Sequence, residues 1–261
     1  MVEGVMSNYD VNLFSSLGKA NRTGFATKLQ LKNTQPISST KKGLRIITDA
    51  GFEWVEAKFK PLERLRNIEF TRDWGLPLQV VQQDERIITA GTQLADSKNN
   101  SIRYQFTNYH RGEGFNGLRN SVYQMQQVKN WRFNNVFMIS QVSSKTDKGY
   151  FLRPTFNITR LFPKWKKYSL SGMYSLEHNS IRKKATDSLS VQSFSFQTLQ
   201  FGLKSDDSKP NNWGISYFTR TDAYPVGKDL IKADRSQNIN LSAELLKSER
   251  HQFRFSSTYR K

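Results

Sequence analysis

The chain has 261 residues, with 40 Lys and Arg against 22 Asp and Glu, and a formal net charge of +18. Cysteine is absent, which excludes disulfides, thiol catalysis and cysteine-based zinc sites. The hydrophobic fraction is only 36%, whereas aromatic residues make up 13%. This composition is poorly suited to a large apolar core. It suits a protein whose apolar side chains form one outward layer while the opposite face meets water.

Apolar and polar residues alternate along most of the chain, which is the pattern of strands with two unlike faces. Residues 168–178 show it most clearly, with tyrosine and leucine on one face and mostly serine on the other. In chain order, the sequence predicts strands at 25–32, 44–58, 85–96, 101–107, 118–129, 133–143, 149–161, 168–178, 191–204, 212–220, 239–245 and 250–260.

Two stretches depart from this regular pattern. In residues 61–80, Pro61 and Pro77 bracket a charged sequence, which predicts an irregular connection with room for a helical turn. In residues 191–204 the apolar set changes parity between Phe196 and Leu199, which predicts a β-bulge.

Short turn sequences separate many of the later strands, for example Asp96–Asn100, Gly112–Gly114 and Thr146–Gly149. Strands joined by such short turns pair antiparallel, so the sequence predicts an all-β, antiparallel up-and-down meander of roughly 12 strands.

Three features favour a partial transmembrane β-barrel over a sheet that packs on a second layer. Several predicted strands run to about ten residues, near the 9–11 that cross a bilayer at a tilt. Polar residues occupy strand middles, as a water-filled lumen allows. Aromatic residues lie near strand ends, where they suit the headgroup zone: Tyr109, Trp131, Tyr150, Trp165, Tyr168, Trp213, Tyr217 and Tyr259.

The two ends of the chain predict that it is an internal piece of a longer protein. The N-terminal sequence has no signal peptide, and no run of 18 apolar residues could form a transmembrane helix. At the other end the strand pattern still runs at Lys261. We therefore expect residues 1–261 to be a single β-barrel segment, interrupted by the connection at 61–80.

A family resemblance rests on three stretches, Phe52–Trp74, Trp213–Pro225 and His251–Arg260. In style, these sequences and most of the chain resemble large outer-membrane β-barrel proteins of the Bacteroidetes type. The resemblance implies a many-stranded barrel in the outer membrane of a Gram-negative bacterium, and it brings no catalytic or ligand residues. The strong positive charge departs from such barrels, which are often nearer neutral or acidic.

Two short motifs are better explained by turns than by ligands. Gly112–Gly117 matches G-x-G-x-x-G, but no helix pattern or acidic residue follows at the positions that a dinucleotide site needs. The glycines are expected to permit positive φ angles in a loop. Lys148–Phe151 is faintly similar to an RNA-recognition strand, and an ordinary turn entering a strand is favoured.

Candidate metal ligands and catalytic groups are scattered. The histidines, His110, His178 and His251, lie far apart in sequence, and the acidic pair Asp206–Asp207 lacks the spacing of a calcium loop. Asp222, Asp229 and Asp234 also fit solvated turns. The sequence therefore predicts no catalytic, cofactor-binding or metal-binding residues, no cofactor and no enzymatic activity.

The function expected from the sequence is a structural or transport role in the bacterial outer membrane, as a porin-like barrel segment. Its partners would be membrane lipid, including lipopolysaccharide, and the remaining strands of the parent chain, without nucleic acid. A basic lumen would favour anionic solutes. Two alternatives are a soluble basic β-protein that binds nucleic acid and an extracellular β-sandwich adhesin.

Overall fold

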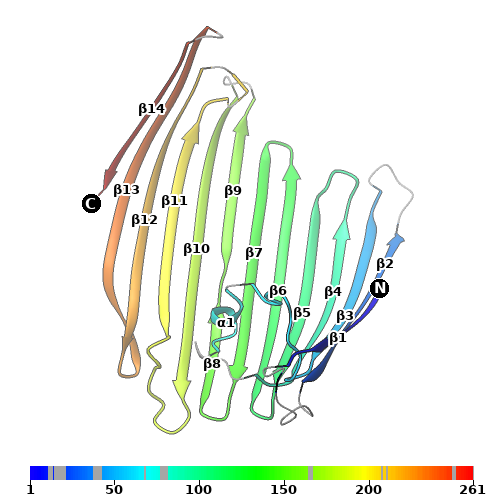
Figure 1. Ribbon diagram of the computed structural model, residues 1–261. Helices are drawn as coiled ribbons and strands as arrows, with labels where there is room; N and C mark the ends of the chain where they lie inside the picture. Colours follow the sequence, from blue (N-terminus) through cyan, green and yellow to red (C-terminus); the bar gives the residue numbers. More distant parts are fainter. Residues whose placement is uncertain are drawn as a thin grey trace.

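A computed structural model describes residues 1–10, 14, 22–37, 43–67, 69–76, 82–163, 167–206, 208–209, 211–248 and 251–260. These residues form one antiparallel sheet of fourteen strands and a single helical turn, α1 (Phe70–Asp73) (Figure 1). The predicted all-β, antiparallel up-and-down meander is thus confirmed. No helix within the described residues is long and apolar enough to cross a membrane.

Each strand pairs with the next in the chain, except that β8 and β9 share one place between β7 and β10. These two strands are separated at Arg153 and Pro154, where proline has no N–H to donate to a ladder. The strands are β1 (Val2–Asn8), β2 (Thr23–Pro36), β3 (Arg45–Val55), β4 (Glu85–Ala95), β5 (Ser101–Arg111), β6 (Phe115–Val128), β7 (Trp131–Ser143), β8 (Asp147–Leu152), β9 (Thr155–Phe162), β10 (Tyr168–Lys183), β11 (Phe194–Lys204), β12 (Asn212–Val226), β13 (Asp229–Ser248) and β14 (His251–Arg260).

The strand count exceeds the prediction of roughly 12 because two strands were missed. The sequence did not predict β1, and the predicted strand at 149–161 is divided into β8 and β9. The irregular connection predicted at 61–80 does join β3 to β4, and it contains α1. Within it, Ile68 and residues 77–80 lie outside the described residues.

The β-bulge predicted in 191–204 is wrong. Strand β11 pairs with β10 and β12 in continuous register, and register shifts occur instead between β12 and β13 and between β13 and β14. The change of parity has a different cause: Phe194 and Phe196 stack with centroids 4.4 Å apart, and the Arg220 guanidinium lies over the Phe196 ring. These two aromatic residues therefore lie on the otherwise polar face of the sheet.

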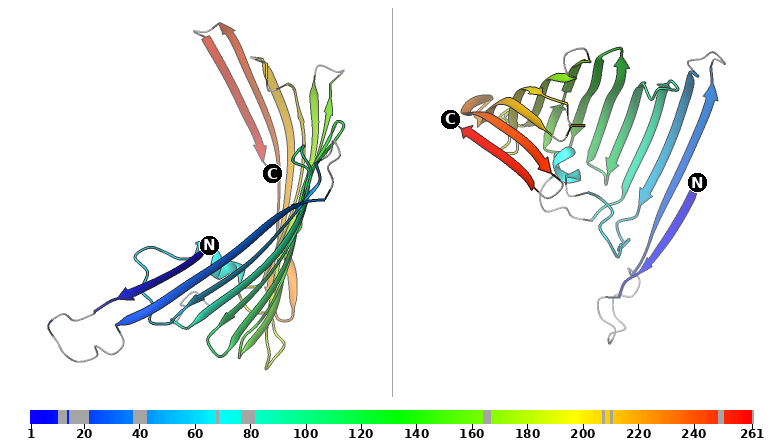
Figure 2. Two further views of the ribbon diagram at one scale, coloured as in Figure 1. Left: turned by 90° about the vertical axis from the view of Figure 1, so that its right-hand side faces the viewer. Right: turned by 90° about the horizontal axis from the view of Figure 1, so that it is seen from above.

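The sheet has a concave and a convex face, and α1 lies on the concave side (Figure 2). Because successive side chains of a strand point to opposite faces, the pairing registers assign each strand residue to one of them. Polar residues such as Gln105 and Arg119 occupy concave positions, and apolar residues such as Phe106 and Val122 occupy convex positions. Many convex side chains are exposed: Leu94, Ile102, Tyr104, Phe137, Phe156, Phe201, Ile215, Leu241 and Phe255.

The convex apolar residues form a band that runs obliquely across the strands. Residues that are opposite one another in register connect Leu31 of β2 with Lys232 of β13 through ten strand-to-strand steps. Toward the end of the sheet that is uppermost in Figure 1, the convex apolar run of β2 ends at Leu31. Toward the same end, the run of β13 extends to Leu245, thirteen residues beyond Lys232. At about 3.3 Å per residue and 4.8 Å between strands, this offset means a strand tilt of roughly 40° relative to the band. Closed barrels have strand tilts of about 35–45°.

The outermost strands of the sheet are β1 and β14, and no register pairs one with the other. Each of them uses only one side of its backbone for pairing with a described neighbour. The free sides are templates for further strands, since unpaired N–H and C=O groups of an edge bind another strand readily.

The register between β11 and β12 can be tested directly, because the chain has no native cysteine. Leu199 pairs with Thr219, whereas Tyr217 pairs with Phe201. We expect the double variant Leu199→Cys with Thr219→Cys to form a disulfide on mild oxidation, measured as loss of alkylatable thiol. The matched pair Leu199→Cys with Tyr217→Cys should remain reduced, and the reverse outcome would contradict the register.

Candidate functional site

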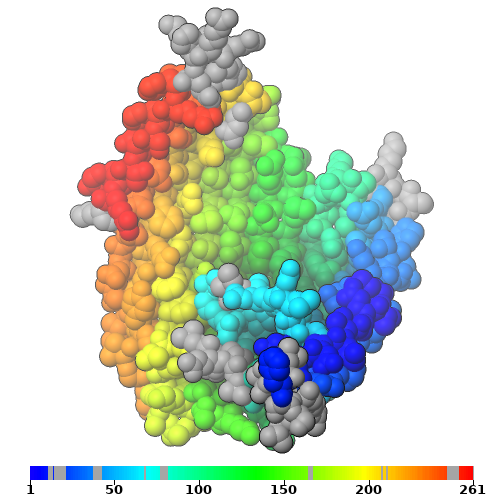
Figure 3. All heavy atoms as spheres, in the orientation of Figure 1, coloured from blue at the N-terminus to red at the C-terminus, as the bar shows by residue number. Residues whose placement is uncertain are grey.

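The concave face carries an inward segment, defined here as the connection from residue 56 to residue 84 between β3 and β4, of which Ile68 and 77–81 are not described. In Figure 3 its atoms, drawn in cyan, lie across the lower part of the concave face. Trp74 and Leu76 are its anchors, 2% and 6% exposed, in a cluster with Tyr109, Phe151 and Ile181 of the sheet. The inward segment is therefore packed against the concave face of the sheet.

Aromatic contacts hold Trp74 in a defined orientation. Its ring lies 5.3 Å from that of Tyr109, which in turn lies 5.2 Å from that of Phe70. The guanidinium of Arg119 lies over the Trp74 ring at 4.1 Å, within the range of a cation–π contact. Arg119 also donates a hydrogen bond of 2.7 Å to the Asp73 carbonyl oxygen.

Glycine at position 117 makes room for this tryptophan. A Cβ atom built there would lie 2.6 Å from two carbons of the Trp74 ring, closer than real contacts allow. Gly112, in the turn between β5 and β6, has φ of 52°, a conformation that glycine adopts without strain. The G-x-G-x-x-G match is thus explained by a turn and a close packing contact, and a strand follows it rather than a helix.

Ion pairs beside the aromatic cluster connect the inward segment to the sheet. Arg66 pairs with Glu53 of β3 and Glu85 of β4, and Arg153 pairs with Asp73 at 2.6 Å. The side chains in these pairs are 14–27% exposed. Pairs near the surface contribute at most about 1 kcal/mol each, whereas truncating a buried tryptophan costs about 3–5 kcal/mol. The aromatic cluster therefore contributes most to the position of the segment, and the ion pairs orient it.

Three further arginines on the concave face are paired with carboxylates. Arg103 binds Asp49 through two hydrogen bonds of 2.7 and 3.0 Å. Arg220 binds Asp222 in the same way, and Arg254 lies 3.1 Å from Glu244. These pairs neutralise part of the positive charge that the strands carry on the concave face.

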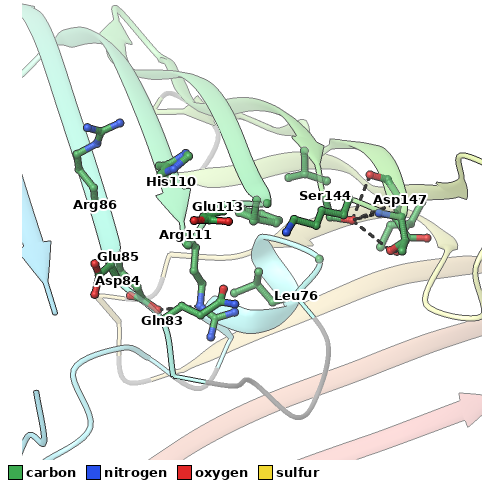
Figure 4. A pocket seen from close by; sticks show the side chains of 18 of the residues that line it. Leu76, Gln83, Asp84, Glu85, Arg86, His110, Arg111, Glu113, Ser144 and Asp147 are labelled. Atoms are coloured by element: carbon green, nitrogen blue, oxygen red, sulfur yellow. Dashed lines mark hydrogen bonds and ion pairs between the residues drawn. The ribbon is translucent and has the colours of Figure 1, made fainter. Parts of the chain in front are cut away.

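A cavity of about 1110 Å³ lies between the inward segment and the lower ends of β5 to β8. Figure 4 shows Leu76 and Gln83 of the inward segment on one side, with Arg111 pointing from β5 toward Gln83, and Glu113 and Ser144 on turns of the sheet. Its lining is mixed, with apolar residues such as Phe115 and Val142 beside both acidic and basic groups. The Thr146 hydroxyl donates an exposed hydrogen bond of 2.6 Å to the Asp147 carboxylate, but the two are neighbouring residues at the start of β8. We therefore attribute this contact to the turn and assign the cavity no chemistry.

The remaining residues that the sequence singled out are not brought together. His110 and His178 lie on the convex face of different strands, and the His178 Nε2 atom lies 3.0 Å from the Tyr150 hydroxyl. The side chain of His251 is outside the described part. Within the described residues, no three His, Asp or Glu side chains lie close enough together to hold a metal ion.

The solvated turns predicted for Asp222 and Asp234 are wrong, because these residues lie within β12 and β13. Two other aspartates do lie in turns, where neighbouring donors bind them. In the turn after β11, the Ser208 hydroxyl donates to the Asp206 carboxylate and lowers its pKa from the ordinary value. The side-chain amide of Asn100 lowers the pKa of Asp96 in the same manner. Asp207 lies outside the described residues. Lys148–Phe151 forms most of β8, with Phe151 buried on the concave side and Tyr150 on the convex side.

Trp74→Ala tests the anchoring of the inward segment. We expect loss of about 3–5 kcal/mol of local stability, measured as faster tryptic cleavage at the arginines of 56–76 in the otherwise folded chain. Leu62→Ala is the matched control, because Leu62 belongs to the same segment but is fully exposed. Equal cleavage rates for the two variants would contradict the anchoring role of Trp74.

Comparison with known proteins adds no further assignment. No family model, no curated protein and no solved structure matches the chain.

Proposed function

We propose that the chain is a segment of an outer-membrane β-barrel in a Gram-negative bacterium, with a structural or transport role and no catalysis. In this proposal the convex face contacts membrane lipid, including lipopolysaccharide, and the concave face lines an aqueous, porin-like interior. The free edges of β1 and β14 pair with further strands of the parent barrel. No nucleic acid and no cofactor takes part.

The distribution of charge between the two faces carries the proposal. Among the described strands, every Asp and Glu occupies a concave register position, and no charged residue interrupts the middle of a convex apolar run. Ionised groups facing lipid are unfavourable, whereas basic side chains near an interface reach the headgroups. The convex charged positions are all basic and lie near the limits of the apolar runs: Arg86, Lys148, Arg160, Arg182, Lys232 and Arg235.

The oblique course of the apolar band supports the same proposal. A band that crosses strands tilted by roughly 40° would lie level in a bilayer, because transmembrane barrel strands tilt by about 35–45°. A flat sheet covered by a second layer has no need for such an offset. The exposure of apolar side chains on the convex face also supports contact with lipid, since Phe201 is 54% and Leu170 is 49% exposed.

The inward segment bears on the kind of transport. It occupies the lower part of the concave face, so a passage through the proposed barrel would be narrowed there. Since strand-middle cations such as Arg103 are paired with carboxylates, the proposal does not include a preference for anions. The proposal includes both a structural role and a transport role.

Two alternatives have less support. A nucleic-acid-binding sheet combines cations and aromatic rings on one surface, yet here the convex aromatic face has few cations. A β-sandwich adhesin covers its apolar face with a second sheet, yet the fourteen strands of the described residues all belong to one sheet.

Single-cysteine labelling tests which face meets lipid. When the chain is reconstituted in vesicles, the variants Gln200→Cys and Ser216→Cys on the concave face should react with a membrane-impermeant maleimide. Phe201→Cys and Ile215→Cys, their neighbours on the convex face, should react slowly until detergent is added. Rapid labelling of all four positions in vesicles would contradict the proposal.

A charge substitution gives a second test. Phe201→Lys should destabilise the membrane-inserted chain by about 2–4 kcal/mol if position 201 lies near the bilayer midplane, measured by urea unfolding in vesicles. Gln200→Lys, on the polar face, should change the free energy of unfolding far less. If both faces of the sheet met water, Phe201→Lys would lower the free energy of unfolding no more than Gln200→Lys does.

A further inference from the structure

We infer that Arg160, together with Trp131 and Phe162, binds the phosphate of a lipid headgroup at the upper edge of the convex face. The inference rests on the proposed function, since it requires the convex face to contact a bilayer. It goes beyond it by naming the residues and the chemical class of the ligand.

Two aromatic rings hold the Arg160 side chain. Its guanidinium carbon lies 5.0 Å from the Trp131 ring centroid and 5.1 Å from that of Phe162, within the distance of cation–π contacts. Rings contact a guanidinium through its planar faces and leave the N–H groups at its edge free. That edge matches two oxygens of a phosphate, which is why arginine is common at phosphate sites.

Arg160 lacks a carboxylate partner within the described chain. No ion pair joins it to any of the described residues, and its side chain is exposed. The strand carboxylates occupy the opposite face of the sheet. Its partners in register on the convex face are Trp131 of β7 and Leu170 of β10, which are 39% and 49% exposed. Its positive charge therefore lies on the convex face beside apolar and aromatic residues of the described strands.

The level of Arg160 on the strand fits a headgroup rather than a lipid tail. It follows Ile158 at the upper limit of the convex run of β9, two residues before the last residue of that strand. At the same end, Tyr168 and Trp213 lie 5.7 Å apart, and aromatic rings of this kind prefer the membrane interface. A lipid-facing arginine is costly at the bilayer centre and nearly free of cost at the interface.

The test compares two brominated quenchers of tryptophan fluorescence in vesicles that contain the reconstituted chain at low salt. One set contains dibrominated phosphatidylglycerol and the other the same mole fraction of dibrominated phosphatidylcholine. An interfacial arginine should enrich the anionic lipid about fivefold beside Trp131, which gives stronger quenching by phosphatidylglycerol. Because the chain has four other tryptophans, the quenching of Trp131 is taken as the difference between chains with Trp131 and the same chains with Trp131→Phe.

The decisive variant is Arg160→Gln, in which the two lipids should quench Trp131 equally. Arg132→Gln is the matched control, because Arg132 is next to Trp131 but occupies a concave position, and it should retain the excess. An excess that persists in Arg160→Gln, or that is absent from the unmodified chain although both lipids quench, overturns the inference. If neither lipid quenches, the proposed function itself fails.

Discussion

The alternation of side chains between two unlike faces is the constraint on which the other features depend. A shift of one residue in any strand would exchange its faces; in β11 it would turn Gln200 outward and Phe201 inward. Register is held by short turns and by cross-strand contacts on the concave face. The Arg103–Asp49 pair spans from β5 to β3 across β4, so it fixes three strands at once.

This alternation is a local property, which is why the sequence predicted most strands and their antiparallel pairing. It predicted less well where distant contacts decide. Phe194 and Phe196 break the period in β11, and their concave position depends on Arg220 and Tyr224 of the next strand. The sequence around them predicts a β-bulge, because a change in which alternate positions are apolar can have two causes. An extra residue in the strand produces it, and so does an aromatic side chain that has a partner on the polar face.

The inward segment was recognised from its prolines and charges only as an irregular connection. Its docking was not predicted, because Trp74 depends on Gly117 and Tyr109, which lie far along the chain and have no periodic relation to it. A glycine that accommodates a ring is indistinguishable in sequence from one that serves a turn. Similarly, Arg153 is separated from its partner Asp73 by eighty residues. These contacts also explain why the segment has a fixed place despite the irregular local sequence.

The oblique apolar band has a geometric consequence for size. A strand tilted by roughly 40° occupies about 6.3 Å of circumference rather than 4.8 Å. The sheet has thirteen strand positions, because β8 and β9 share one, so its arc is about 80 Å long if that tilt is kept throughout. A barrel closed from these strands alone would be about 26 Å across between opposite backbones, and each added strand would widen it. An interior of that width can hold a folded segment such as 56–84 and still leave space for water beside it.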